Sequence, residues 1–438
     1  MPRASRSPVA SYEARIVEYE LRSRTPEQAR YSPALPTQRS AARPSPRTGP
    51  ARLASLSHPR RAGRPLSRQR ALVRARARLR RIVALTFVIL VADALVSYSS
   101  AMLGPSNVGF GVRTVEWLRD NGAAGLVSDI ERVYYSVAAP GTGGPALHAL
   151  PRLGFGGSAL AGAYRPAPIA PAIIPALPGE GAWRGTGGPL VRGAPPVLVT
   201  TFRPNPSYPQ MVAGVAWVDA SRAWLQLYPG RYEPPSSTPI GGAEVPPQLR
   251  AGLLATFNSG FKLEDSGGGF VAFGHVYARL RDGLATFVRL RDGTADIRAW
   301  SGGADPGPEV TFARQNLPLI VDGGQLNSNL SDGALWGATL GNAVRVWRSG
   351  VGVDARGDIL YAAANDQTAT SLAQILQRAG AVRAMELDIN SEWVTFNFYG
   401  SPWAGNPSKL LPGMTRDPTR YLSPDDRDFF AVYARTGG

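Results

Sequence analysis

Three acidic side chains lie within seven residues of the segment Met385–Trp393, which reads MELDINSEW. If its first five residues form a strand, successive side chains point to opposite faces. One face then carries three apolar side chains, Met385, Leu387 and Ile389. The other face carries three polar ones, Glu386, Asp388 and Asn390. Carboxylates at a strand end beside a turn are suited to chemistry, although a solvated strand face explains the same pattern.

A helix is expected just before this acidic strand. Thr370–Ala379 places apolar residues at i, i+3, i+4 and i+7, as one face of an amphipathic helix does. Thr368 or Thr370 can cap the start of the helix, and Gly380 can end it. The helix therefore delivers the chain directly into the acidic strand.

Strand patterns dominate the sequence from Val197 onward. They include VLVTTF, MVAGVAWVDA and AWLQLYP, then GFVAFGHVYARL, ATFVRL and ADIRAW as a predicted β-meander. VGVDARGDILYAA predicts a hairpin, and Phe429–Ala434 predicts the last strand. The fold class is therefore α+β: a β-rich single globular domain with few helices, spanning residues 196–436.

The excess positive charge is confined to the N-terminal segment. Residues 1–81 hold 20 arginines and 4 glutamates, which accounts for the whole net charge of +16. The rest of the chain is electrically balanced, which removes the charge-based argument for nucleic-acid binding. Low hydrophobicity with high charge predicts that residues 1–81 form a disordered tail.

A single transmembrane helix is predicted for residues 82–103, a run of 22 mostly apolar residues. Arginines crowd its N-terminal side, which predicts a cytoplasmic tail and an extracytoplasmic body. The long leader favours an uncleaved signal anchor in the cell membrane over a cleaved signal peptide. Residues 104–139 are expected to form a helical membrane-proximal stalk, and residues 140–195, rich in Gly, Pro and Ala, a linker.

The scarcity of cysteine and histidine limits the metal chemistry. The chain has no cysteine and three scattered histidines, which excludes disulfides and thiolate sites and does not suggest a zinc cluster. Oxygen ligands remain available, and these favour a divalent cation such as Ca²⁺ or Mg²⁺. No cofactor is predicted.

Four segments occur in an order that resembles the phosphodiester glycosidase family. These segments are FNSGF at 257–261, VDGG at 321–324, VWRSGVGVD at 346–354 and GAVRAMELDINSEW at 380–393. The resemblance covers roughly residues 196–436. Ser259, Ile389 and Asn390 stand where the family has glycines, so the loop after Asp388 is expected to have a different shape.

The resemblance implies a set of site residues. The candidates for substrate binding are Asn258, Gly260, Gly323, Arg348, Gly352, Asn390 and Ser391. Asp388 is the first choice for stabilising positive charge at an anomeric carbon, with Asp322 or Glu386 as the second carboxylate. Arg348 is expected to make a bidentate contact with a phosphate, and Asn258 to hold a sugar hydroxyl.

Each candidate also has a structural explanation. Asp322-Gly323-Gly324 is an ordinary turn sequence, Arg348 can be a surface arginine, and Ser391 suits a turn better than a nucleophile. The predicted function is a membrane-anchored extracytoplasmic hydrolase that cleaves a glycosyl phosphodiester in envelope polysaccharide or glycoconjugate. The alternatives are a non-catalytic glycan-binding module and a structural envelope protein.

Overall fold

The computed structural model describes residues 66–153, 166–236, 239–337 and 345–435. Most of the predicted tail therefore lies outside the described residues. The chain divides into two compact units, one containing the described residues from Gly104 onward and the other containing the long helix α2. We call the first unit the body and describe the two units separately.

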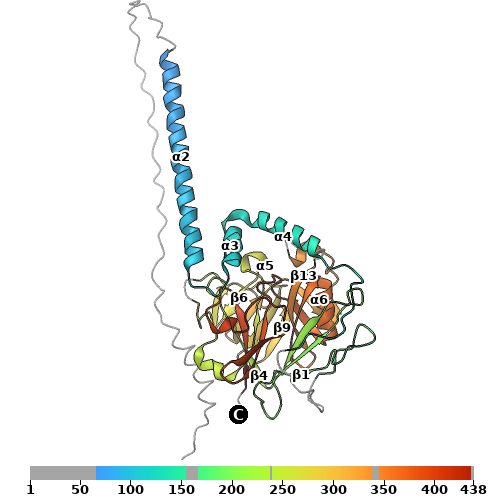
Figure 1. The fold of residues 1–438 in the computed structure, drawn as a ribbon. Coiled ribbons are helices and arrows are strands. Elements are labelled where there is room, and N and C mark those ends of the chain that lie inside the picture. Colours follow the sequence, from blue (N-terminus) through green and yellow to red (C-terminus); the bar gives the residue numbers. More distant parts are fainter. Residues whose placement is uncertain (1–65, 154–165, 237–238, 338–344, 436–438) are drawn as a thin grey trace, which may run out of the picture. The chain divides into compact units, whose positions relative to one another are not determined.

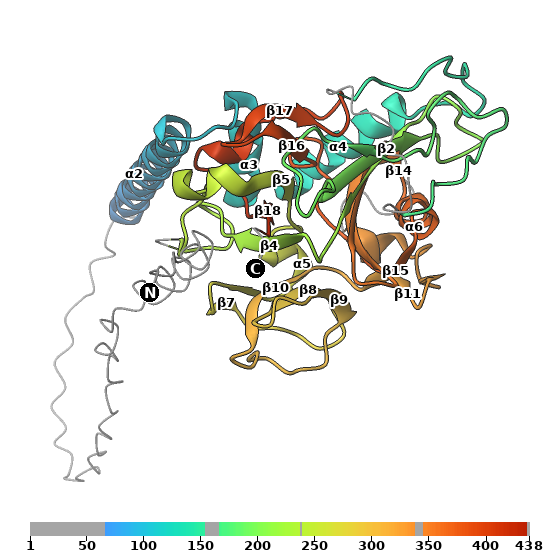
Figure 2. The ribbon, with the colours of Figure 1, turned by 90° about the horizontal axis from the view of Figure 1, so that it is seen from below.

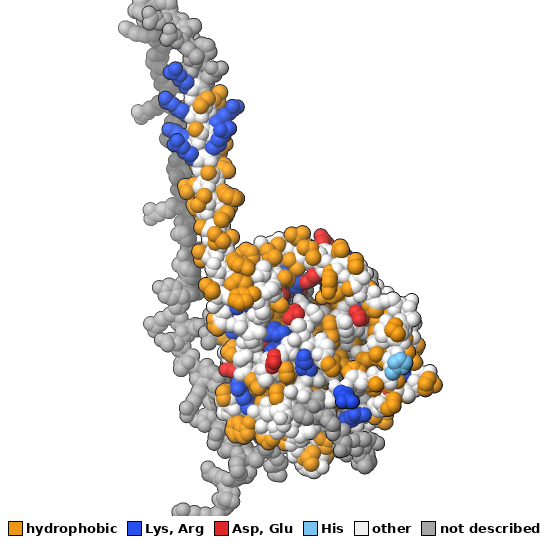
Figure 3. All heavy atoms as spheres, in the orientation of Figure 1, with side chains coloured by type: hydrophobic (Ala, Val, Ile, Leu, Met, Phe, Trp, Pro, Cys, Tyr) orange, Lys and Arg blue, Asp and Glu red, His pale blue; other side chains and the backbone are white. Residues whose placement is uncertain are grey.

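Helix α2 (Leu66–Leu103) begins earlier than the predicted transmembrane helix. Residues 66–81, expected to belong to the disordered tail, are helical because Leu, Arg, Gln and Ala favour helices and no Gly or Pro interrupts them. Arginines gather in the first half of the helix and apolar side chains in the second (Figure 3). By length and composition, Arg70–Leu103 is apolar enough to cross a membrane.

Three antiparallel sheets form the body (Figures 1 and 2). The eight-stranded sheet runs in the order β1 (Arg184–Gly185), β2 (Val197–Phe202), β3 (Ala213–Val218), β14 (Ile359–Gln367), β13 (Val346–Asp354), β15 (Ala381–Glu386), β11 (Leu319–Asp322) and β12 (Gln325–Leu326). One five-stranded sheet runs in the order β7 (His275–Ala278), β6 (Phe270–Ala272), β10 (Val310–Gln315), β8 (Ala285–Leu290) and β9 (Ala295–Ala299). The other runs β17 (Gly405–Lys409), β16 (Phe396–Ser401), β5 (Leu253–Asn258), β18 (Phe429–Ala434) and β4 (Ala223–Tyr228).

The helices of the body are few and short. They are α3 (Phe110–Leu118), a π-turn (Arg119–Ala123), α4 (Ala124–Ala138), α5 (Leu263–Ser266) and α6 (Ala369–Arg378), with 3₁₀ turns at Pro247–Gly252, Gly333–Trp336 and Arg420–Leu422. Gly122 has a φ of 89°, and this left-handed residue turns the chain from α3 into α4. The described body is thus mostly sheet, in agreement with the predicted fold class.

One apolar core lies between the three sheets. Phe430 of β18 is at its centre, with ring centroids 5.1 Å from Phe257, 4.9 Å from Phe287 and 5.7 Å from Phe312. The last two rings belong to a different sheet from Phe430, so these contacts join the sheets. Each buried phenylalanine contributes about 1.5–3 kcal/mol relative to an exposed one.

The amphipathic helix before the acidic segment forms as predicted. Helix α6 buries Leu372, Ile375 and Leu376 against a second apolar cluster on the outer face of the eight-stranded sheet (Figure 2). The Thr368 side chain accepts a hydrogen bond from the Ser371 backbone, and the Ser371 hydroxyl accepts one from the Thr368 backbone. This capping box satisfies two backbone groups at the helix start.

The strand order differs from the predicted meander. Strand β10 lies between β6 and β8, so the GFVAFGHVYARL and ATFVRL strands do not pair with each other. Strands β3 and β4 likewise belong to different sheets, although only a tight turn separates them in sequence. Local patterns fix the strands and their turns, but pairing depends on which apolar faces meet in the core.

Residues before β2 pack onto the body. The segment predicted as a linker has little regular structure, yet Trp183 is fully buried and Glu180 forms a buried ion pair with Arg203 at 2.8 Å. Two helices occur where the stalk was expected. The chain ahead of them is fixed to the body, because Ser106 donates to Asp426 at 2.6 Å and Asn107 donates to Asp425 at 3.1 Å.

We expect Thr368→Ala to destabilise the body by about 1 kcal/mol, because it removes the side-chain cap of α6. The midpoint of thermal melting should fall by roughly 2–4 °C, which circular dichroism of the detergent-solubilised chain can measure. Gln374→Ala, at an exposed position of the same helix, is the matched control. Equal midpoints for the two variants would contradict the role of the cap.

Candidate active site

We call α3 and α4 the cap helices. A cavity of about 230 Å³ is lined by the π-turn and α4 on one side and by loops of the sheet domain on the other. The acidic segment forms one part of its wall, and α4 forms another. Its lining residues are Arg119, Ala124, Ser128, Glu131, Tyr135, Phe261, Lys262, Glu264, Asp265, Leu317, Leu335, Gly337, Asp388, Ile389, Asn390, Trp393 and Arg427. We call this cavity the Asp388 pocket.

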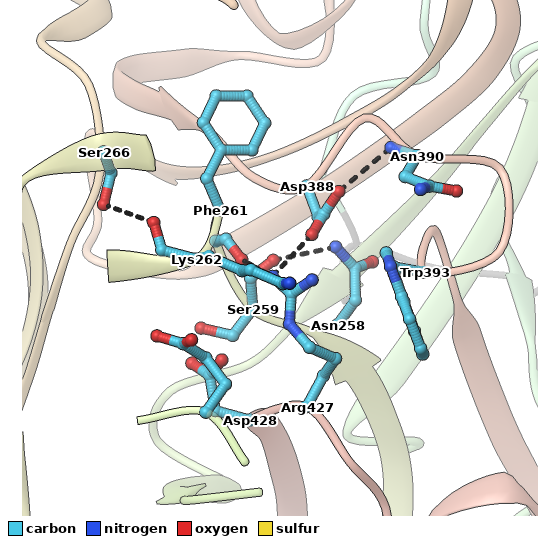
Figure 4. A network of polar contacts seen from close by, with 12 residues as sticks. Asn258, Ser259, Phe261, Lys262, Ser266, Asp388, Asn390, Trp393, Arg427 and Asp428 are labelled. Carbon is cyan, nitrogen blue, oxygen red and sulfur yellow. Dashed lines mark hydrogen bonds and ion pairs between the residues drawn. The ribbon is translucent and has the colours of Figure 1, made fainter. Parts of the chain in front are cut away.

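Asp388 stands two residues after the end of β15, where the chain turns away from the sheet. One carboxylate oxygen accepts from Arg427 Nη2 at 2.8 Å, and the other accepts from the Asn390 backbone at 2.9 Å (Figure 4). Arg427 also donates to the Gly260 carbonyl at 3.1 Å and lies 5.4 Å from the Trp393 ring centroid. The carboxylate is therefore held in one orientation at the pocket wall.

Asn258 fixes the loop that carries Asp388. Its amide nitrogen donates to Ser349 Oγ at 3.0 Å, and Ser349 Oγ donates to the Asp388 carbonyl at 2.8 Å. Its amide oxygen accepts from Tyr361 at 2.8 Å and from the Thr395 backbone at 3.0 Å. Asn258 is 2% exposed and is not among the residues that line the pocket, and its hydrogen bonds hold the strand ends and the acidic loop together.

Burial raises the pKa of Asp388 above its ordinary value, while the Arg427 guanidinium opposes that rise. Burial, followed by the charge of Glu264, also raises the pKa of Asp265 on α5. Two carboxyl groups with raised pKa values therefore line one pocket. A carboxyl group in such surroundings can hold a proton closer to neutral pH than an exposed one and can donate it to a leaving group.

Lys262 links the pocket to the first cap helix. Its ammonium lies 2.8 Å from Glu116 and 2.8 Å from Asp120. Burial lowers the pKa of Lys262, but Glu116 and Asp120 outweigh that effect and raise it overall. The lysine therefore stays charged and holds α3 against the body.

Glu386 and Arg348 do not share the pocket with Asp388. Both side chains are fully buried and form an ion pair with each other, and Arg348 also donates to the Gln367 carbonyl at 3.1 Å. Burial raises the pKa of Glu386, and Arg348 opposes that rise. The guanidinium that was expected to contact a phosphate is thus bonded within the protein interior, and Arg348 is not among the residues that line the pocket.

Asp322 also lies away from the pocket. It pairs with Gln325 across a two-residue hairpin turn in which Gly323 and Gly324 have φ values of 55° and 75°. Strand β11 runs antiparallel to β15 with Val321 opposite Ala384, which puts Asp322 toward the start of β15 and Asp388 beyond its end. Asp322-Gly323-Gly324 is thus the ordinary turn that its sequence allowed.

The other predicted residues divide between the pocket and the fold. Asn390 lines the pocket, and Ser391 lies beside Tyr135 of α4. Gly260 contributes the carbonyl that Arg427 binds. Gly352 has a packing role in β13, since a Cβ there would lie 2.9 Å from the Ala381 Cβ.

The alternation of side chains predicted for the acidic segment stops two residues before Asp388. Strand β15 stops at Glu386, so Asp388 is reached through a turn and does not share a sheet face with Glu386. Ile389 stands where the resemblance led us to expect a glycine, and it packs in a small apolar cluster with Phe261 and Val346. The Ile389 side chain therefore packs the loop against the body, whereas a glycine at this position would make no such contact.

Sequence reasoning missed Arg427 and Asp265, and it expected helices in residues 104–139 without placing them at the pocket. Arg427 belongs to the charged run Asp425–Asp428, which immediately precedes the last strand. Such a run at a strand end could have indicated a site residue from the sequence. Lys262 was another such signal, as one of two lysines in the chain. Among the described residues, no group of three or more His, Asp or Glu side chains is arranged to hold a metal ion.

Arg348→Met should destabilise the body by about 3–5 kcal/mol, because it leaves the Glu386 charge buried without its partner. The double variant Arg348→Met/Glu386→Met should recover most of that loss. Arg356→Met is the control, since its ion pairs are at the surface and contribute less than about 1 kcal/mol. Thermal melting measures all three. A normal melting midpoint for Arg348→Met with impaired substrate binding would return Arg348 to the site.

Comparison with known proteins supports the predicted resemblance. Residues 251–388 match the family model described as phosphodiester glycosidase. Similar solved structures include the zebrafish N-acetylglucosamine-1-phosphodiester alpha-N-acetylglucosaminidase catalytic domain auto-inhibited by its pro-peptide, at 16% identity, 56% coverage of this chain, 85% of that chain and a TM-score of 0.36. Another is a hypothetical protein from Synechocystis, at 13% identity, 56% and 63% coverage and a TM-score of 0.32.

No curated protein matches the chain. The family match contains three of the four motifs in full and part of the fourth, begins just before β5 and ends at Asp388 itself. The resemblance of this chain to the phosphodiester glycosidase family is therefore confirmed over residues 251–388.

Proposed function

We propose that the chain is a membrane-anchored extracytoplasmic hydrolase that cleaves a glycosyl phosphodiester in envelope polysaccharide or glycoconjugate. The observation that carries this proposal is the position of Asp388. It is the last residue of the family match, and it lines a pocket together with a second carboxyl group, Asp265.

The proposed chemistry uses Asp388 at the anomeric carbon. Cleavage of a sugar–phosphate bond develops positive charge on the sugar ring, which a nearby carboxylate stabilises. Asp265 is the proposed second carboxyl group, in place of Glu386 and Asp322, because it lines the same pocket. A phosphate ester leaves more easily than an alcohol, so a modest proton donor is sufficient.

Arg427 is the proposed phosphate contact. It lines the pocket, it is 7% exposed, and its Nε atom has no hydrogen-bond partner among the described residues. A guanidinium can bind a phosphate through two parallel hydrogen bonds. Substrate binding would then draw Arg427 partly away from Asp388. The Arg427 charge would oppose the rise in the pKa of Asp388 less strongly.

The proposed location rests on α2. Its arginines precede its apolar half, which favours an inserted helix with a cytoplasmic N-terminus. The body would then face the extracytoplasmic side, where envelope glycans are found. The helix crosses as a single pass in this proposal, which keeps the enzyme at the membrane.

A second candidate is a non-catalytic glycan-binding module. One observation favours it, because both carboxylate oxygens of Asp388 already accept hydrogen bonds. A carboxylate used only for structure would be held in this way. Turnover measurements distinguish the two candidates.

Asp388→Asn keeps the shape of the side chain but removes its charge. We expect kcat on a sugar-1-phosphodiester to fall by several orders of magnitude, because electrostatic stabilisation of this kind contributes roughly 3–4 kcal/mol or more. The assay uses the full chain in detergent with a panel of glycosyl phosphodiesters, and thermal melting serves as the folding control.

Asp322→Asn is the matched control for this experiment, because Asp322 is another motif aspartate and lies outside the pocket. It should keep a rate close to that of the wild type. A folded Asp388→Asn protein with the wild-type rate would remove Asp388 from the mechanism. Saturable glycan binding without turnover in the wild type would favour the binding module.

The proposed topology predicts which part of the chain a protease can reach. Protease added to intact spheroplasts should digest residues after about 104 and spare the N-terminal segment, because the body is expected outside. Immunoblotting with tags at the two ends gives the measurement. A protected body that becomes sensitive only after lysis would overturn the location and the substrate class together.

A further inference from the structure

Helix α4 has its apolar face on the outside. Successive residues of an α-helix are about 100° apart, so Leu126, Ile130, Val133 and Val137 form one stripe. Their exposed fractions are 65%, 61%, 64% and 83%. In Figure 3, hydrophobic side chains cover the edge of the body where Figure 1 places α4.

The opposite stripe of α4 faces the protein. It carries four smaller or polar residues that line the Asp388 pocket, Ala124, Ser128, Glu131 and Tyr135. A surface helix of a soluble protein normally turns its apolar stripe to the core and its polar stripe to water. The reversed arrangement of α4 indicates that its outer face meets an apolar surface.

The chain itself indicates which apolar surface this is. The apolar half of α2 ends at Leu103, and Ser106 is already hydrogen-bonded to Asp426 of the body. Asn107 is held as well, by Asp425 and by Arg416. At 3.8 Å per residue, about 11 Å of chain separates Leu103 from Ser106. If α2 spans a bilayer, the body is therefore tied to the bilayer surface without a long stalk.

We infer that the outer stripe of α4, Leu126, Ile130, Val133 and Val137, rests in the lipid bilayer surface. This inference rests on the proposed membrane insertion of α2. An interfacial helix buries its apolar face about 5–10 Å into the boundary between headgroups and acyl chains. Asp129 and Arg132 form an exposed ion pair on the flank of the stripe, where the headgroups and water lie.

The absence of cysteine makes a direct test simple, because each single-cysteine variant carries one fluorescent label. The full chain is reconstituted into vesicles of phosphatidylcholine and phosphatidylglycerol, with and without a spin-labelled lipid that quenches nearby fluorophores. The test positions are Ile130→Cys and Val133→Cys. Leu190→Cys is the matched control, because Leu190 is an equally exposed apolar residue outside α4. It follows β1, a strand that Figure 1 shows at the opposite end of the body from α4.

We expect a blue-shifted emission and a loss of fluorescence at positions 130 and 133 when the quenching lipid is present, and neither change at position 190. Water-like emission without quenching at 130 and 133 would overturn the inference. A blue shift without lipid quenching that weakens at low protein-to-lipid ratio would identify a second copy of the chain as the occupant, which also overturns it.

Val88→Cys in the apolar half of α2 separates this inference from the proposed function. A label there should be strongly quenched by the lipid. If it is not, α2 does not insert and the inference about α4 fails with it, while hydrolysis by the detergent-solubilised chain is unaffected. Normal thermal melting of each labelled variant shows that the body remains folded.

Discussion

The buried ion pair between Arg427 and Asp388 joins two sheets at the point where both leave the core. Asp388 follows the last residue of β15 in the eight-stranded sheet, and Arg427 precedes β18 in a five-stranded sheet. Each charge lies in surroundings that would penalise it alone, so each stabilises the ionised form of the other. The pair holds the Asp388 carboxylate at the pocket wall, and the Arg427 charge limits the rise that burial causes in the pKa of Asp388.

Two neighbours of Arg427, in the segment Asp425–Asp428, also form buried ion pairs. Asp425 pairs with Arg420 at 2.6 Å, and Asp428 pairs with Arg314 at 2.8 Å. Three neighbouring charges thus bind three partners from different parts of the chain. Behind the pocket, the pair of Arg348 and Glu386 repeats the arrangement inside the protein, where it supports β13 and β15. Arg314, Arg348 and Arg420 thus form buried ion pairs, whereas Arg427 forms one and also lines the pocket.

Local signals in the sequence predicted the local structure well. Helix α6 with its cap at Thr368, the hairpin of β13 and β14, and the last strand all follow from periodicity and turn residues. The motif order also directed attention to Asp388. These features depend on residues close together in the chain, for which spacing alone determines the geometry.

The remaining features depend on distant residues and could not be read from spacing. Arg427 meets Asp388 only after β18 inserts between β5 and β4. Glu386 and Asp388 were expected on one face, but the strand ends between them. Asp322 seemed equivalent to Asp388 by motif, whereas the antiparallel register sends it to the other end of β15. The spacing of apolar residues in α4 is typical of a helix, but it did not indicate which face of the helix would pack against the body.

The two-sided helix α4 constrains how this protein can change in evolution. Inserting or deleting one residue within α4 would rotate everything after it by about 100°, moving apolar side chains toward the pocket and pocket residues outward together. Changes close to a whole number of turns, such as about seven residues, return both stripes to their places. Point substitutions on either stripe remain independent, so the pocket can diversify freely while the length of the helix above it stays fixed.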